Sequence, residues 1–224
     1  MKSKIEDLVG RAALVSIFAY FAILGLSGLE KLLANPWAND TWLLDLVVRT
    51  AGFLFLLLIV ATTLIRLPAK NSAVGLEPRI SAILGTFLTQ LLIVLPKGEI
   101  SAEAKILAAV IIFCGTGVSI YCLYWLGRSF SVMAHARHLV TEGPYSVVRH
   151  PLYAAEMITL LGITLANFSF LATLIIATTI AFQFRRMANE ERILHATFPE
   201  YEGYSRTVPM IIPARAHRWS RQGE

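Results

Sequence analysis

The sequence predicts an all-α protein, a multi-pass membrane bundle of about six helices. Hydrophobic residues make up 56% of the 224 residues and charged residues only 16%, and the mean hydropathy is +0.62. This composition is typical of an integral membrane protein and excludes an ordinary soluble domain. The apolar residues also gather in long runs, and a helix needs about 17–25 of them to cross a bilayer.

Six such runs can be drawn, and the third and fifth are short. Only Asn167 interrupts the last two runs, so they are expected to form a tight helical hairpin whose arms need not cross the bilayer separately. One helix through both runs would be much longer than a bilayer is thick, which is disfavoured. The runs are approximately Ala12–Leu33, Leu46–Leu67, Ile80–Leu95, Ile106–Leu126, Leu152–Ala166 and Phe168–Phe184.

The ends of the chain differ in character. The first run is too long for a signal peptide, and no small-residue cleavage site follows it. The polar segment Arg185–Phe198 is compatible with a helix that continues out of the last membrane run. Cys114 and Cys122 lie in one apolar run and are interpreted as small core residues rather than a disulfide.

Basic residues predict the orientation. By the positive-inside rule, both termini and the loops on their side are cytoplasmic, in a bacterial inner membrane or in the endoplasmic reticulum of a eukaryote. The pI near 9.4 reflects residues spread over loops, so nucleic acid is not an expected partner. The expected cytoplasmic side holds 16 of the 20 Lys and Arg residues: Lys2, Lys4, Arg11, Arg66, Lys70, Arg79, Arg128, Arg137, Arg149 and the seven arginines from Arg185 to Arg221.

Two polar clusters interrupt this apolar pattern. The first covers Arg137–Tyr145 and Arg149–Tyr153, and it combines His, Arg, Gly, Pro and Tyr between two apolar runs, where such residues are costly. The second contains Arg186 and Glu190, which share a helix face because they are four residues apart. Taken alone, the first cluster could be an ordinary cytoplasmic loop, and the second could be an exposed ion pair. The interpretation as a functional site is favoured by further residues of the same tail. They are Tyr201, Tyr204 and the segment Val208–Pro213, which is expected to fold back against the membrane surface.

Three segments carry a family resemblance: HLVTEGPYSVVRHPLY, NEERILHATFPEYEGY and VPMIIP, in that order. Together they resemble the C-terminal catalytic half of the isoprenylcysteine carboxyl methyltransferase family and its phospholipid and thiol methyltransferase relatives. The resemblance runs from about Leu126 to Pro213. It implies methyl transfer from S-adenosyl-L-methionine to a lipophilic acceptor, foremost a carboxylate. It also suggests a division into N-terminal membrane helices at 1–126, a catalytic region at 127–213 and a basic tail at 214–224.

The resemblance also assigns roles to residues. Arg186 and Glu190 are the expected catalytic residues, with Arg186 and Glu156 toward the acceptor. Arg137 stands where relatives often have histidine, and Ala155 stands near where they often have glycine. The expected cofactor pocket consists of Arg137, His138, Leu139, Val140, Tyr145, His150, Pro151, Leu152, Tyr153 and Glu190.

These residue types suit the expected chemistry. Imidazole suits the carboxylate of the cofactor, tyrosine its adenine or sulfonium, and Glu190 its amine or hydroxyls. An ionised carboxylate acceptor needs no base, and Arg186 would hold it. An amine or thiol acceptor would use a base, either His138 or Glu156. Glu156 could instead pair with Arg149 at the membrane surface.

Other functions are open at this point. The acceptor is expected to be a small lipophilic molecule or a prenylated substrate that comes from the bilayer. Membrane lipids are the other expected partners. Methylation of a phospholipid amine or a thiol is an alternative, as is a nicotinamide-dependent sterol reductase. A transporter or assembly factor is the non-enzyme alternative. His135, His138 and His150 lack partners at ligand-like spacing, so no metal site is expected.

Overall fold

The structure is a computed structural model that describes residues 2–36, 40–93, 95 and 100–213. It confirms the all-α class, since the short ladder of β1 and β2 is the sheet structure of the described part. The elements are α1 (Lys2–Ala34), α2 (Trp42–Ile65), β1 (Asn71–Ser72), α3 (Leu76–Phe87), η1 (Leu88–Ile93), α4 (Ala102–Leu126), η2 (Gly127–Ser129), β2 (His135–Ala136), η3 (Gly143–Ser146), α5 (Pro151–Ala166), α6 (Phe170–Thr197) and α7 (Tyr201–Thr207).

All six predicted apolar runs are helical, but among the described residues only four helices are long and apolar enough to cross a membrane. They are Leu8–Ala34, Trp42–Ile65, Ala102–Ser129 and Phe170–Thr197. Four of the about six expected membrane helices thus have the length and composition of a full crossing. The third run changes from the 12-residue α3 into the 3-10 helix η1, and α5 has 16 residues, fewer than a full crossing needs.

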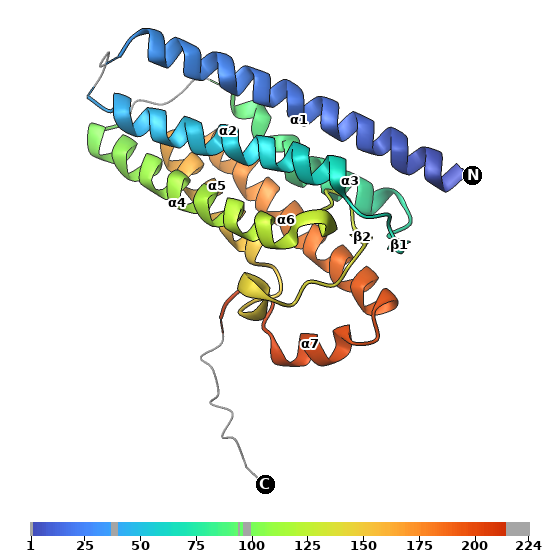
Figure 1. The fold of residues 1–224 in the computed structure, drawn as a ribbon. Coiled ribbons are helices and arrows are strands. Elements are labelled where there is room, and N and C mark those ends of the chain that lie inside the picture. Colours follow the sequence, from blue (N-terminus) through green and yellow to red (C-terminus); the bar gives the residue numbers. More distant parts are fainter. Residues whose placement is uncertain (1, 37–39, 94, 96–99, 214–224) are drawn as a thin grey trace.

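The long helices form one bundle (Figure 1). Helix α2 packs against α1 and α4, α4 packs against α5, and α3 lies along α6. The N-terminal end of α1 and the β1–β2 ladder lie at one end of the bundle, and the connection between α5 and α6 lies at the other (Figure 1). The positive-inside orientation, with both termini cytoplasmic, stays a prediction, and the tail 214–224 lies outside the described residues.

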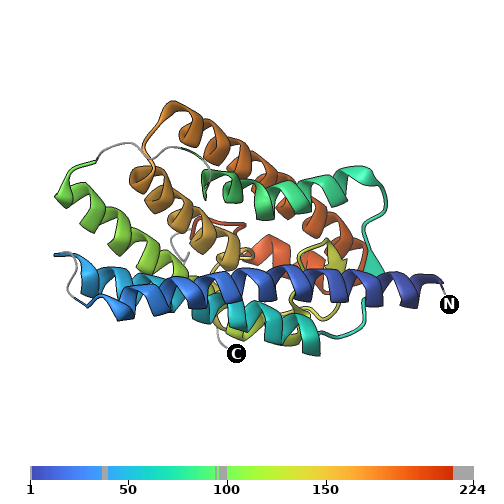
Figure 2. The same cartoon turned by 90° about the horizontal axis from the view of Figure 1, so that it is seen from above.

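The predicted hairpin is confirmed at its turn. Asn167 ends α5 and donates a hydrogen bond to the Ile163 carbonyl over 2.9 Å, and Ser169 caps α6 by accepting one from the Ala172 N–H. The two helices then diverge, as Figure 2 shows, and α6 packs mainly along α3. Helix α6 continues without a break through the predicted polar extension to Thr197.

Glycines set the close packing of α4 on α5. A Cβ on Gly115 would lie 2.4 Å from Thr159 Oγ1, and a Cβ on Gly162 would lie 2.9 Å from the Ala108 carbonyl oxygen. Only a residue without a side chain fits at either place. This contact fixes the position of α5, which carries Tyr153 and Glu156.

The segment between α4 and α5 is tied to the end of α2. The Leu67 N–H donates to the Arg128 carbonyl over 2.9 Å, and Ser72 pairs with His135 in the antiparallel ladder. At the far end of the segment, Gly143 has φ +57°, and a Cβ there would meet the Trp125 ring at 2.4 Å. The loop that bears the first polar cluster is thus held against the helices at both ends. The division at 126 and 213 stays a prediction.

Candidate active site

One cavity of about 470 Å³ is lined by residues from all seven described α-helices, from η1 and from the α4–α5 loop. Its lining combines polar residues of the three sequence segments with apolar residues of the membrane helices, including Phe18, Phe55, Leu56, Ile59 and Leu160. The volume lies within the range of about 300–1,000 Å³ that is usual for small-molecule sites.

The cavity brings together the predicted site residues, with one exception. Pro151 does not line it: this residue is buried and begins α5, a position where its missing N–H costs nothing. The residues that do line the cavity are Arg137, His138, Leu139, Val140, Tyr145, His150, Leu152, Tyr153, Glu156, Arg186 and Glu190. Their roles in binding or catalysis stay predictions.

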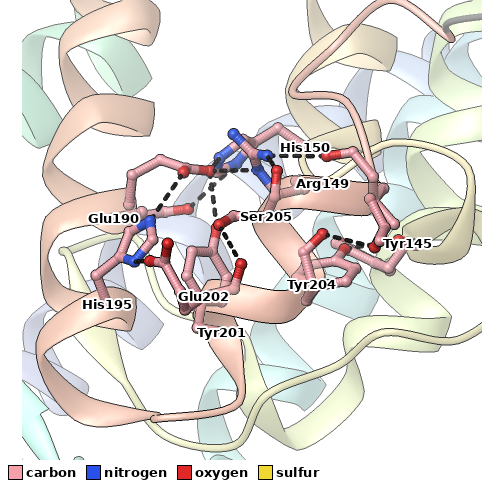
Figure 3. A network of polar contacts seen from close by, with 12 residues as sticks. Tyr145, Arg149, His150, Glu190, His195, Tyr201, Glu202, Tyr204 and Ser205 are labelled. Carbon is pink, nitrogen blue, oxygen red and sulfur yellow. Dashed lines mark hydrogen bonds and ion pairs between the residues drawn. The ribbon is translucent and has the colours of Figure 1, made fainter.

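Glu191, which the sequence did not single out as a site residue, is the acceptor that joins Arg149, His150 and Tyr201, three residues labelled in the polar network of Figure 3. Its Oε1 accepts hydrogen bonds from Arg149 Nε at 3.0 Å, His150 Nε2 at 2.7 Å and the Tyr201 hydroxyl at 2.7 Å. Three donors, two from the α4–α5 loop and one from α7, therefore converge on one carboxylate of α6. Glu191 therefore holds cavity-lining residues in place and does not itself line the cavity.

Arg149 also fastens the C-terminal segment. Its Nη1 donates to the carbonyls of Ser205 and Val208 at 2.5 and 2.8 Å, at the C-terminal end of α7 where a cation is favourable. The N–H groups of Arg149 and His150 donate to the Pro209 and Met210 carbonyls at 2.9 and 3.0 Å. The segment expected to fold against the membrane surface is thus paired with the site loop, and its place relative to the membrane stays a prediction.

A second network runs through the cavity wall. The Tyr153 hydroxyl donates to Glu190 Oε1 over 2.6 Å, and the Arg186 guanidinium lies 5.0 Å from the centre of the Tyr153 ring. Arg186 Nη1 donates to Gln183 Oε1 at 3.1 Å, and Gln183 Nε2 donates to Glu156 Oε2 at 2.8 Å. Arg186 and Glu190, expected as a helix pair, are joined through Tyr153 and form no direct ion pair in the described structure.

One expectation about a charged partner is corrected, and the structure gives the contacts of Arg137. Glu156 contacts Gln183 rather than Arg149, because Arg149 is held by Glu191 and by α7. Arg137 is only 2% exposed, and its guanidinium donates to the Leu67 carbonyl and contacts His135 Nδ1 at 3.2 Å. Arg137 therefore ties the loop to the end of α2 while it lines the cavity.

The tyrosines outside the membrane helices keep their protons at neutral pH. Burial raises the pKa of Tyr145 well above its usual value. Burial, together with the hydrogen bond to Glu191, does the same for the pKa of Tyr201, and burial raises the pKa of Tyr204 to about 12. The Tyr204 hydroxyl donates to the Tyr145 carbonyl at 2.6 Å, whereas the buried Tyr145 hydroxyl has no hydrogen-bond partner in the described structure.

Residues 104–201 match the family model of phospholipid methyltransferases. This confirms the predicted family resemblance for the region from α4 to the start of α7. The matched region lies in a chain with four helices, among the described residues, that are long and apolar enough to cross a membrane.

Individual relatives match between 34% and 41% of the chain. The protein-S-isoprenylcysteine O-methyltransferase of Schizosaccharomyces pombe is 37% identical over 94 residues, which cover 39% of this chain and 40% of the relative. A cobalt-zinc-cadmium resistance protein of Cupriavidus metallidurans is 37% identical over 76 residues, 34% of this chain and 35% of the relative. A nickel-cobalt-cadmium resistance protein of Alcaligenes xylosoxydans xylosoxydans is 33% identical over 92 residues, 41% of this chain and 40% of the relative. The chain thus covers two fifths or less of the length of each.

Proposed function

We propose that the protein is an integral membrane methyltransferase that uses S-adenosylmethionine to methylate a lipophilic acceptor. The observation that carries this proposal is the single cavity, which joins polar residues of the three sequence segments to apolar residues of the membrane helices. A polar cofactor and an apolar acceptor need such a shared space, because transfer requires their reacting atoms in contact and water kept out.

The residues present fit the cofactor. Tyr145 offers a buried hydroxyl that has no hydrogen-bond partner in the described structure, and a bound cofactor can supply one. Glu190 lines the cavity and is held by Tyr153, so its carboxylate can accept from the cofactor's amine or hydroxyls, and the Tyr204 and Tyr153 rings suit its adenine or sulfonium. When bound, the cofactor supplies an electrophilic methyl group. The chain's part is to orient both reactants and exclude water.

The acceptor is proposed to come from the bilayer, as a small lipophilic molecule or a prenylated substrate. The S. pombe relative, by its name, acts on isoprenylcysteine, and a carboxylate acceptor would call for a free guanidinium fork. Arg186 lines the cavity and offers part of one: its two terminal nitrogens donate to Gln183 and to the Val132 carbonyl, whereas its Nε has no hydrogen-bond partner in the described structure. By the positive-inside rule, the site is proposed to face the cytoplasm.

Calorimetry of the detergent-purified protein with S-adenosylhomocysteine and with NADPH tests this function. We expect S-adenosylhomocysteine to bind and NADPH not to bind. Tyr145→Phe should weaken binding by about 3- to 10-fold, the value of one hydrogen bond, and leave the thermal stability of the unliganded protein unchanged. Glu190→Gln should weaken binding further.

Tyr124→Phe is the matched control, because Tyr124 is 73% exposed and lies outside the cavity. Unaltered S-adenosylhomocysteine affinity in both site variants would contradict the cofactor assignment. Binding of NADPH in its place would favour a reductase.

A further inference from the structure

Glu156 is a carboxylate that faces the cavity without a charged partner. It lies three residues after Tyr153 and therefore on the same side of α5, beside Thr159 and Leu160 in the lining. Its Oε2 accepts from Gln183, and its Oε1 accepts from no group in the part of the chain that the structure describes. A carboxylate among apolar helices is costly and usually has a function.

Gln183 is the hydrogen-bond partner of this carboxylate. Its amide oxygen accepts from Arg186, so its amide nitrogen must be the group that donates to Glu156. Gln183 thus stands between the cation and the anion and keeps them from pairing directly. Glu156 Oε1 therefore keeps its lone pairs free in the described structure, while the two terminal nitrogens of Arg186 donate to Gln183 and to the Val132 carbonyl.

We propose that Glu156 is the catalytic base of the site and that the acceptor is a nucleophile with a labile proton, an amine or a thiol, rather than a carboxylate. This rests on the proposed methyltransferase function. A carboxylate acceptor has no proton to lose and would be repelled by Glu156, whereas an ammonium or thiol would be attracted to it.

The proton and electron balance is simple. An ammonium gives its proton to Glu156 Oε1 and reacts as the neutral amine, and a thiol gives up its proton as it reacts. The acceptor nitrogen or sulfur forms a bond to the methyl carbon while the bond from that carbon to the sulfonium breaks. The electron pair of the broken bond stays with the departing sulfur, and the proton stays on Glu156 until the product leaves.

Binding of simple probes tests the charge preference without turnover. Octylamine and octanoate have the same number of carbon atoms and differ in the charge of the head group. The binding of each is measured by calorimetry with the protein saturated by S-adenosylhomocysteine. We expect octylamine to bind at least about tenfold more tightly than octanoate. Glu156→Gln keeps an acceptor for Gln183 but removes the charge, so it should abolish this preference while S-adenosylhomocysteine affinity stays within about twofold of wild type.

Glu77→Gln is the matched control. Glu77 is exposed, lies outside the cavity and also accepts from an amide, that of Asn189 at 2.9 Å. This variant should retain the preference for octylamine. In a parallel turnover assay with S-adenosylmethionine, octylamine or octanethiol should be methylated faster than octanoate, and Glu156→Gln should lower that rate at least about 100-fold.

Several results overturn the inference. They are equal or tighter binding of octanoate, binding of neither probe, faster or exclusive methylation of octanoate, methylation of none of the three, and a Glu156→Gln variant that behaves as wild type. A parallel loss of S-adenosylhomocysteine affinity and thermal stability in Glu156→Gln would show a structural role only. If S-adenosylhomocysteine does not bind the wild type, the proposed methyltransferase function itself is contradicted. This result differs from the ones above, which contradict only the role of Glu156 and the acceptor class.

Discussion

Two neighbouring carboxylates of α6 have different tasks. Consecutive helix residues point about 100° apart, so Glu190 and Glu191 cannot share an environment. Glu190 lines the cavity and is held by Tyr153, whereas Glu191 accepts three donors that join α6 to the loop and α7. The sequence pair Glu-Glu does not reveal which carboxylate is which, because the donors come from residues 10 to 42 positions away.

The buried tyrosines predict a loss of stability in alkali. The folded state holds the Tyr204 proton up to a pKa of about 12, against the usual 10.0 in the unfolded chain. A raised pKa in the folded state gives a stabilisation that is complete below pH 10 and is lost as the pH rises toward 12. The free energy of unfolding should therefore fall over this window.

Chemical denaturation of the detergent-solubilised protein at several pH values checks this prediction. Tyr204→Phe should make the decline between pH 10 and 12 shallower. Tyr124→Phe, at an exposed position, should leave the decline as it is in the wild type. Identical pH dependence in wild type and Tyr204→Phe would show that Tyr204 is not the group responsible.

At the level of helices, the α4–α5 contact positions the reacting side chains. A methyl group on Gly115 would collide with Thr159, whereas a methyl group on Gly117 of the same helix would meet nothing within 4 Å. Gly115→Ala should therefore force α5 outward and cost about 1–3 kcal/mol. Gly117→Ala should cost nothing, since alanine favours a helix over glycine. Thermal unfolding compares the two variants, and equal midpoints would mean that the close contact has no energetic weight.

The helices themselves were predictable, because long apolar runs have few other structures in a membrane. The number of helices that are long and apolar enough to cross a membrane was not. The third run contains Thr89 and Gln90 and becomes the 3-10 helix η1, while α5 has only 16 residues. In the same way, the sequence motifs identified eleven residues that line the cavity, but not Gln183 or Glu191, whose importance arises only from contacts between distant segments.

At the scale of the whole molecule, the orientation in the membrane can be measured. Positions Asn39 and Gly98, expected on the outer side, lie outside the described residues, but Asp40 and Phe168 are described and exposed on the same expected side. In a background where Cys114 and Cys122 are replaced by alanine, Asp40→Cys and Phe168→Cys should react with an impermeant maleimide added to intact cells. Glu142→Cys should react only after the membrane is opened. Labelling of Glu142→Cys from outside would reverse the orientation.

The account's central claim is that one cavity joins a polar cofactor to a lipophilic acceptor in the membrane. The most direct measurement follows a labelled methyl group. The purified protein, reconstituted in a lipid extract of its own host membrane, is incubated with S-adenosylmethionine labelled in the methyl group, and the products are partitioned between water and organic solvent. We predict that label enters the organic phase with the wild type and the Tyr124→Phe control but is lost with Glu190→Gln. Label that stays in the water phase with every variant would contradict the claim.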